Sequence, residues 1–178
     1  MKVLQTKLND CVIIEPDVFQ DERGFFLETF NASRYYELAG IEHTFVQDNH
    51  SRSTKGILRG LHFQKTKPQG KLVRVVNGQV FDVAVDIRKE SSTFGKWQSV
   101  ILSETNKKQF WVPPGFAHGF LVLSDTADFE YKCTDFYDPS DEGNIIWDDP
   151  DFGINWPIDQ PLLSNKDSNA PKFIDLEK

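Results

Sequence analysis

The sequence lacks the signatures of several common classes of enzyme and membrane protein. It contains no phosphate-binding P-loop, no dinucleotide fingerprint and no Gly-x-Ser-x-Gly elbow. Its two cysteines, Cys11 and Cys133, have no paired spacing, so we expect no disulfide framework and a reducing compartment. No apolar run is long enough to span a bilayer, and residues 1–7 lack the apolar core of a signal peptide. We therefore expect a cytoplasmic protein that does not enter a membrane.

The chain also lacks an excess of positive charge. It has 20 Lys and Arg residues against 27 Asp and Glu residues, for a formal net charge of −7. This balance argues against a nucleic-acid groove and against binding to an anionic membrane surface. It does not argue against a small anionic substrate, because a pocket can be locally cationic.

Aromatic residues and turn signals indicate an all-β protein. The 15 Phe and 4 Trp residues favour strands, and turn signals separate the predicted strands at roughly ten-residue intervals, as in a sandwich or barrel. We predict one domain over residues 1–178, with a Pro-rich C-terminal wrap packed through its tryptophans. A short helix is predicted between an Asn31 N-cap and Gly40. Asn77-Gly78 predicts a type I′ hairpin. The predicted strands are 12–16, 25–30, 45–51, 71–76, 79–88, 97–102, 109–112, 120–123 and 129–134.

The stretch 59–64, RGLHFQ, places a cation, an imidazole and an amide close together. Alternate side chains of a strand share a face, so we predict that Arg59 points to one face and His62 to the other. A lone histidine on a strand is usually structural. Here a second histidine, His118, follows in PPGFAHG (113–119), and Tyr131 lies on a later strand with its side chain predicted to point inward. Together these groups favour acid–base chemistry.

The stretches around the two histidines look like degraded forms of the two cupin metal-binding motifs. In the first of them, Gln64 stands where a second histidine ligand would be needed. Two well-separated histidines do not complete a metal site without carboxylates, and no motif here supplies them. We therefore predict no metal ligands.

Seven stretches, in order and over nearly the whole chain, resemble the dTDP-4-dehydrorhamnose 3,5-epimerase family. They are DERGFF (21–26), QDNHS (47–51), RGLHFQ (59–64), GKLV (70–73), FDVAVDIR (81–88), PGFAHGF (114–120) and IWDDP (146–150). The resemblance implies a cupin-like jelly-roll barrel that acts as a homodimer without metal or organic cofactor. It also implies inversion of C3 and C5 of dTDP-4-dehydro-6-deoxy-D-glucose, which gives dTDP-4-dehydro-L-rhamnose for deoxysugar and polysaccharide synthesis.

The resemblance implies roles for individual residues. His62 matches the family's base, Asp167 the carboxylate that orients it, Tyr131 the acid on the opposite face, and Lys71 the cation near the 4-keto oxygen. Phe26 is expected from its chemistry to stack on the thymine. The remaining residues that fall where the family binds the nucleotide sugar are Arg23, Glu28, Gln47, Asp48, Asn49, Arg59, His118, Glu142 and Lys166.

The chemistry of such a set is consistent with epimerisation. One C4 ketone makes the protons on both C3 and C5 acidic, and a cation at the C4 oxygen stabilises the resulting enolate in a water-poor pocket. Close relatives invert only C3 or only C5 and keep most of these motifs, so a single-centre epimerase is the first alternative. A metal-dependent cupin enzyme and a non-catalytic sugar-binding jelly roll are the others.

Overall fold

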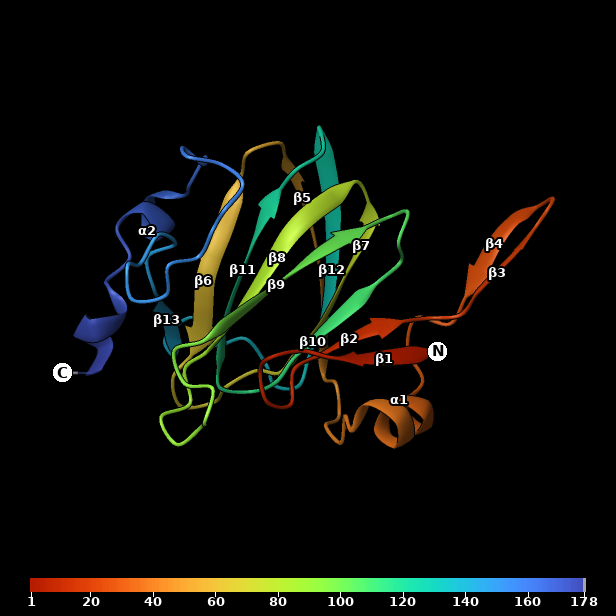
Figure 1. The fold of residues 1–178 in the computed structure, drawn as a ribbon, viewed down its shortest axis with the longest axis horizontal. Helices are drawn as coiled ribbons and strands as arrows, with labels where there is room; N and C mark the ends of the chain where they lie inside the picture. The colour runs from red at the N-terminus through yellow and green to blue at the C-terminus, as the bar shows by residue number, and fades with distance from the viewer. Residues whose placement is uncertain (178) are drawn as a thin grey trace.

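Two antiparallel β-sheets face each other and enclose the interior of the protein (Figure 1). The computed structural model describes residues 1–177, so the last residue of the predicted domain, Lys178, lies outside the described residues. The six-stranded sheet contains, in spatial order, β1 (Lys2–Gln5), β2 (Val12–Glu15), β10 (Gln109–Val112), β7 (Lys71–Asn77), β12 (Thr126–Cys133) and β5 (Gln47–Thr54). The five-stranded sheet contains β13 (Glu142–Asn144), β6 (Leu58–Gln64), β11 (Phe116–Val122), β8 (Gln79–Asp86) and β9 (Trp97–Ser103). The predicted all-β architecture is confirmed.

The five-stranded sheet is buried on both faces. Along β8, Val80 and Ala84 pack into the interior between the sheets, whereas Val83 and Val85 pack on the outer face. The chain after β13, which includes α2 (Asn165–Ser168) and η1 (Phe173–Glu177), covers that outer face (Figure 1). Trp156 is buried there, and Trp147 packs against the same cluster.

A single helix covers part of the outer face of the six-stranded sheet. This helix, α1 (Ala32–Ala39), buries Tyr35 against Leu72 and Trp111. The Asn31 side chain accepts a hydrogen bond from a backbone N–H in the first turn, and Gly40 ends the helix with φ of 67°. Both predicted caps are confirmed. None of the helices in residues 1–177 is long and apolar enough to cross a bilayer.

The predicted hairpin at Asn77-Gly78 is wrong. The strands on either side of it, β7 and β8, belong to different sheets and do not pair with each other. Gly78 has φ of 78°, and a Cβ on it would lie 2.0 Å from the Thr126 carbonyl oxygen. The glycine therefore serves a close backbone approach where the chain passes from one sheet to the other.

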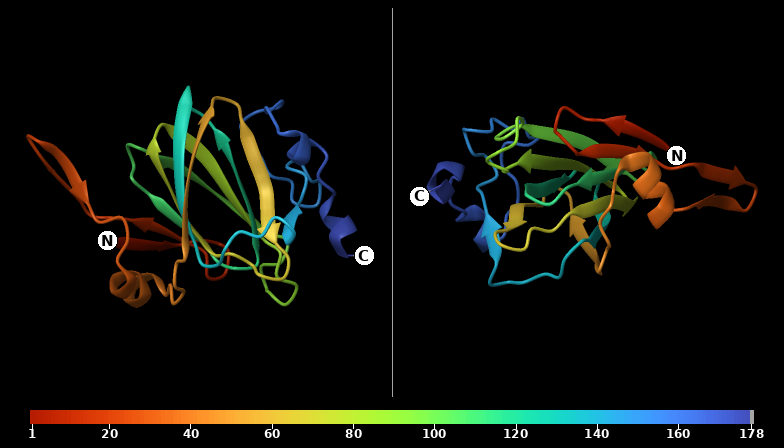
Figure 2. Two further views of the ribbon diagram at one scale, coloured as in Figure 1. Left: turned by 180° about the vertical axis from the view of Figure 1, so that it is seen from behind. Right: turned by 90° about the horizontal axis from the view of Figure 1, so that it is seen from below.

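A two-stranded hairpin formed by β3 (Val18–Asp21) and β4 (Gly24–Leu27) projects from the body of the protein (Figures 1 and 2). We call this hairpin the arm. The predicted strand 25–30 is thus shorter than expected and pairs only with β3. Phe19, Phe25 and Phe26 of the arm are 64%, 56% and 69% exposed. Such a hairpin is only marginally stable by itself, and its apolar side chains need a surface to cover them.

Candidate active site

A β-bulge in β6 places Arg59 and His62 on the same face of the sheet. In the register with β11, His62 lies opposite His118, and Arg59 lies opposite Phe120. Three steps along β6 thus match two steps along β11, which is a bulge. Phe120 belongs to the interior core, so both Arg59 and His62 face the interior. The prediction that they point to opposite faces is wrong, because the extra residue changes the alternation.

Gly60 is the residue that makes this bulge possible. Its φ is 138°, and a Cβ on it would lie 2.6 Å from the Cα of Gly119 in the neighbouring strand. A side chain at this position would therefore face both an unfavourable backbone conformation and a collision with backbone that cannot move aside.

We expect Gly60→Ala to lower the free energy of unfolding by about 3 kcal/mol, because strain and collision add. Gly95→Ala is the matched control, since Gly95 also has a positive φ of 72° but has open space around it. Gly95→Ala should lower the free energy of unfolding by only about 1 kcal/mol. Urea unfolding of both variants tests the difference, and equal losses would contradict the role of the close approach.

His62 forms a short hydrogen bond with Asp167. Its Nε2 lies 2.6 Å from the Asp167 Oδ1 atom, and the two side chains are 25% and 3% exposed. Asp167 lies in α2, where its backbone N–H donates to the Ser164 hydroxyl at the N-cap. Burial of Asp167 favours its neutral form, but the bond with His62 and contacts with Ser164 and the Gly60 backbone amide outweigh burial. The pKa of Asp167 therefore lies below its ordinary value, and the ionised carboxylate can orient the imidazole.

His118 faces the interior beside His62, but its Nε2 is held by Asp82. The two carboxylate oxygens of Asp82 lie 2.9 and 3.0 Å from that nitrogen. Asp82 is fully buried, and burial raises its pKa, although the nearby charges of His118 and Lys71 oppose the shift. The sequence reasoning did not single out Asp82. The sequence did contain a signal for it. Asp82 is a carboxylate on the face of β8 opposite Val83, which is the face that carries Val80 and Ala84 into the interior.

Tyr131 and Lys71 project into the interior from the opposite sheet. Tyr131 packs against the interior core beside Phe129, as predicted. Lys71 lies opposite Cys133 in the register of β7 and β12, and Cys133 and Tyr131 share one face of β12. Burial raises the pKa of the Tyr131 phenol, so it is protonated at neutral pH. Burial lowers the pKa of Lys71, which makes no ion pair within residues 1–177.

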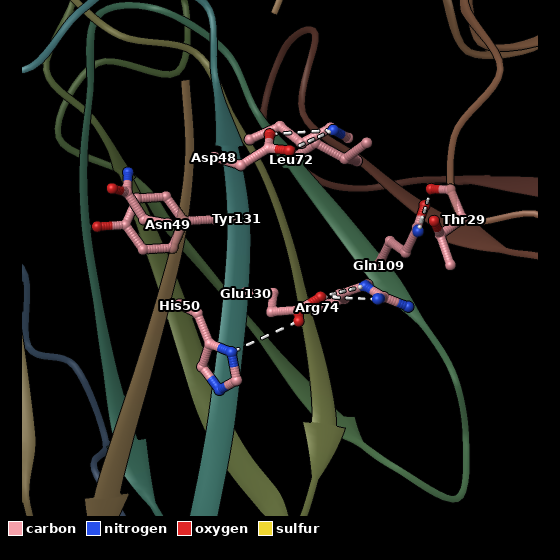
Figure 3. Close-up of a pocket in the computed structure, with 10 residues that line it drawn as sticks. Thr29, Asp48, Asn49, His50, Leu72, Arg74, Gln109, Glu130 and Tyr131 are labelled. Atoms are coloured by element: carbon pink, nitrogen blue, oxygen red, sulfur yellow. Dashed lines mark hydrogen bonds and ion pairs between the residues drawn. The ribbon is translucent and has the colours of Figure 1, made fainter. Parts of the chain in front are cut away.

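The predicted site residues of β5 divide between its two faces. Asn49 lies opposite Tyr131, and Gln47 lies opposite Cys133, so both belong to the interior side. Asp48 points to the outer face, where Lys132 Nζ lies 3.0 Å from its carboxylate. Figure 3 shows this division, with Asn49 and Tyr131 on one side of the strands and Asp48 on the other. The structure therefore does not bring Asp48 together with His62.

The outer side of these strands holds a cavity of about 320 Å³ whose charged groups are paired with one another (Figure 3). Arg74 donates to Glu130 at 2.7 Å, and His50 lies 3.6 Å from the same carboxylate. Next to them, Arg52 and His50 bind Asp128 and lower its pKa to about 2. These charges are separated from the His62–Asp167 pair by the six-stranded sheet, because they lie on its opposite face.

A second cavity, of about 570 Å³, contains the His62–Asp167 pair, and Arg59 and Lys166 also line it. At its rim, Lys166 Nζ lies 2.8 Å from Glu142 Oε1, and the Tyr137 hydroxyl donates to Glu142 Oε2 at 3.2 Å. We call this cavity the His62 cleft. It brings an imidazole with an orienting carboxylate together with two cations. Within residues 1–177, no three His, Cys, Asp or Glu side chains are grouped as a metal site requires.

Three of the predicted substrate-binding residues lie away from the His62 cleft. Arg23 and Phe26 are on the projecting arm, where Arg23 pairs with Asp21. Glu28 follows the arm and accepts hydrogen bonds from Arg34 at 2.8 Å and from Asn31. The structure of one chain therefore does not bring these three residues together with His62.

Comparisons with known proteins agree with one another. The family model described as dTDP-4-dehydrorhamnose 3,5-epimerase matches residues 5–175. A dTDP-4-dehydrorhamnose 3,5-epimerase from Shigella flexneri is 57% identical over 99% of this chain and 98% of its own length. The crystal structure of a dTDP-6-deoxy-D-glucose-3,5-epimerase from Legionella pneumophila, in complex with dTDP-4-keto-L-rhamnose, is 57% identical, with a TM-score of 0.95 over 99% of this chain and 95% of that one. A 3′-monoepimerase from Streptomyces bikiniensis, in complex with dTDP-quinovose, is 34% identical, with a TM-score of 0.90 over 99% and 89% of the two chains.

Proposed function

The chain belongs to the dTDP-4-dehydrorhamnose 3,5-epimerase family, and from this premise we propose that its His62–Asp167 pair drives the inversion of C3 and C5 of dTDP-4-dehydro-6-deoxy-D-glucose. The protein is an isomerase, and dTDP-4-dehydro-L-rhamnose is the product. The observation that carries the proposed roles is that His62 and Tyr131 project into one interior from opposite sheets. Inversion of a carbon needs a base on one face and a proton donor on the other, and this arrangement supplies both.

In the proposed mechanism, His62 removes the proton from C3 or C5, and Asp167 stabilises the imidazolium that forms. Loss of either proton places negative charge on the C4 oxygen, and Lys71 stabilises this enolate from within the barrel. Tyr131 then donates its phenolic proton to the opposite face of the same carbon. The raised pKa of Tyr131 supports this role, because the phenol keeps its proton until the enolate forms.

We propose that the rim of the His62 cleft binds the nucleotide diphosphate. Arg59 and Lys166 supply positive charge, and a diphosphate requires such charge in an otherwise acidic protein. On the interior side, Gln47, Asn49 and His118 offer hydrogen-bonding groups to the sugar. No step of this mechanism requires a metal or an organic cofactor.

The exposed arm supports a homodimer in which each arm reaches the cleft of the partner subunit. In the chain itself Arg23 and Phe26 lie away from His62, yet both fall where the family binds the nucleotide sugar. The arm has three exposed phenylalanines, and its two strands form a sheet of their own, so it needs a covering surface. A second copy of the chain, related by two-fold symmetry, would cover both arms at once.

If each arm acts in the cleft of the partner subunit, two defective variants should restore each other's activity when they are mixed. We expect the double variant Arg23→Ala/Phe26→Ala to raise KM by about tenfold, because it loses a cation and an aromatic contact. Mixing it with His62→Ala subunits and allowing exchange should restore low-KM turnover, since one mixed site combines an intact arm with an intact His62. The double variant Lys96→Ala/Ile101→Ala, altered at two exposed residues outside the arm, is the control. Absence of restoration after confirmed subunit exchange would show that the arm does not act on the partner.

A single-centre epimerase is the second candidate, because the 34% identical 3′-monoepimerase has the same fold. The two candidates differ in which carbon exchanges its proton. The purified, chelator-treated protein should be incubated with dTDP-4-dehydro-6-deoxy-D-glucose in D₂O, and deuterium should be followed by NMR. We expect deuterium at both C3 and C5, with both centres inverted.

The other outcomes of this experiment are distinct. Deuterium at one carbon alone would identify a single-centre enzyme. No exchange, with tight binding of the sugar, would favour a sugar-binding protein. Activity that appears only after a divalent metal is restored would favour a metal-dependent enzyme.

A further inference from the structure

The segment that joins β12 to β13 is held by side-chain amides and not by a sheet. Residues 135–138, which we call the strap, form neither helix nor strand. The Gln69 Nε2 donates to the Asp135 carbonyl at 2.8 Å, and the Gln47 Oε1 accepts from the Tyr137 N–H at 2.9 Å. The strap carries two neighbouring aromatic side chains, Phe136 and Tyr137, which are 65% and 48% exposed. Its position therefore depends on a few polar contacts.

Gln64 makes the largest number of these contacts. Its Nε2 donates to the carbonyl of Lys67 at 2.7 Å and to that of Phe136 at 3.3 Å. Its Oε1 accepts from the N–H of Asp138 at 2.8 Å. Gln64 is only 5% exposed, so water cannot easily replace these bonds. One amide thus ties the loop after β6 to the strap, and neither of its donors is left for a ligand.

The strap leads directly to the rim of the His62 cleft. The Tyr137 hydroxyl donates to Glu142, and the other oxygen of Glu142 pairs with Lys166, the neighbour of Asp167 in the sequence. Glu142 also lies opposite Gln64 in the register of β13 and β6. Gln64 therefore holds the first end of a chain of contacts that runs from the strap through Tyr137 and Glu142 to Lys166.

We infer that Gln64 is a positioning residue that sets the affinity for the nucleotide part of the substrate. It does so by holding the strap, and through Tyr137 and Glu142 it holds Lys166 at the rim of the cleft. The inference rests on the proposed function. Because Gln64 contacts backbone groups of the two loops, and His62 contacts Asp167, loss of the Gln64 bonds should weaken binding and leave the chemical step largely unchanged.

The test is Gln64→Met, which keeps the length of the side chain and removes its hydrogen bonds. We expect KM and the Kd for dTDP to rise about tenfold, with kcat changed by less than about threefold. Gln64→Glu should bind as weakly as Gln64→Met, because a carboxylate cannot donate to the carbonyls of Lys67 and Phe136. The matched control is Gln98→Met on β9, whose amide, among residues 1–177, bonds only the neighbouring carbonyl of Ser99. It should change neither constant.

Two results would overturn the inference. One is a large loss of kcat with unchanged KM, which would mean that Gln64 acts on the chemical step. The other is normal affinity in a folded Gln64→Met protein. If that variant does not fold, Tyr137→Phe tests the same chain of contacts by removing only the bond to Glu142, and it should raise the Kd for dTDP about threefold. Unchanged affinity in Tyr137→Phe would then reject the inference.

The failure of the inference can be told from the failure of the proposed function. Calorimetric titration with dTDP measures affinity without turnover, so it tests Gln64 even if the natural protein exchanges no proton. A natural protein that binds no dTDP would overturn both.

Discussion

Replacing His62 with alanine should lower kcat by about 10³-fold and abolish deuterium incorporation at both C3 and C5, while the protein remains folded. The size of the effect follows from the role of a single base at two centres, since positioned acid–base groups typically contribute about 10²–10⁴-fold. The variant should fold because the ring lies in a cleft and not in the core, and Asp167 keeps its bond to Ser164. Because the buried Asp167 carboxylate loses its hydrogen bond to His62, the free energy of unfolding should fall by about 1–3 kcal/mol.

Asp167→Asn should accompany this variant, because it keeps the shape of the pair and removes the charge. An amide can no longer stabilise the imidazolium, so we expect kcat to fall about 10²-fold with little change in KM. The low pKa of Asp167 has a further consequence for the pH profile. The carboxylate remains ionised throughout the neutral range, so a change in activity near pH 7 should not follow the titration of Asp167. A folded His62→Ala variant with near-normal exchange would remove His62 from the mechanism.

Replacing Tyr131 with phenylalanine should separate proton exchange from inversion. His62 can still remove a proton and return it to the face from which it came, so deuterium should enter the substrate without a change of configuration. Product formation should fall by about 10²–10³-fold, because the interior then lacks the phenolic donor on the opposite face. The phenylalanine ring keeps the packing against Phe129, whose ring centroid lies 5.9 Å away, so the fold should be unaffected.

The chain offers a matched control for this variant. Tyr35 is also a buried tyrosine, and burial raises its pKa to about 12, but it belongs to α1, on the outer side of the six-stranded sheet. Its hydroxyl donates to Gln109 Oε1 at 2.6 Å and lies 3.0 Å from the Thr29 carbonyl oxygen. Tyr35→Phe should lower the free energy of unfolding by about 1 kcal/mol and leave turnover unchanged. Full inversion by Tyr131→Phe, measured under the same conditions, would exclude Tyr131 as the donor.

The sequence predicted those features that follow from a regular period or a local cap. The inward direction of Tyr131 follows from the two-residue period of a strand, and the bounds of α1 follow from Asn31 and Gly40. The period failed in β6, because the glycine at position 60 inserts an extra residue and no local pattern indicates a bulge. The hairpin predicted at Gly78 failed for a similar reason. A glycine that turns a hairpin and a glycine at a crossing between two sheets have the same neighbours in sequence.

The contacts of the site that lie far apart in the chain were harder to predict. His62 and Asp167 are separated by 105 residues, and only the resemblance to a family related them. Asp82 was not recognised, because its partner His118 is identified only by the pairing of β8 with β11. The arm was read as part of a longer strand, and nothing in its sequence shows that it leaves the body of the protein.

The burial of the five-stranded sheet on both faces has a consequence for the motions of the two proposed catalytic groups. His62 lies on β6, in the middle layer of the protein, between the interior core and the C-terminal wrap. Tyr131 lies on β12, whose other face carries charged side chains such as Glu130 and Lys132. Backbone amides in a layer packed on both sides open to solvent less often than those in a layer packed on one side. We therefore expect the backbone amides of β6 around His62 to exchange with solvent more slowly than those of β12 around Tyr131.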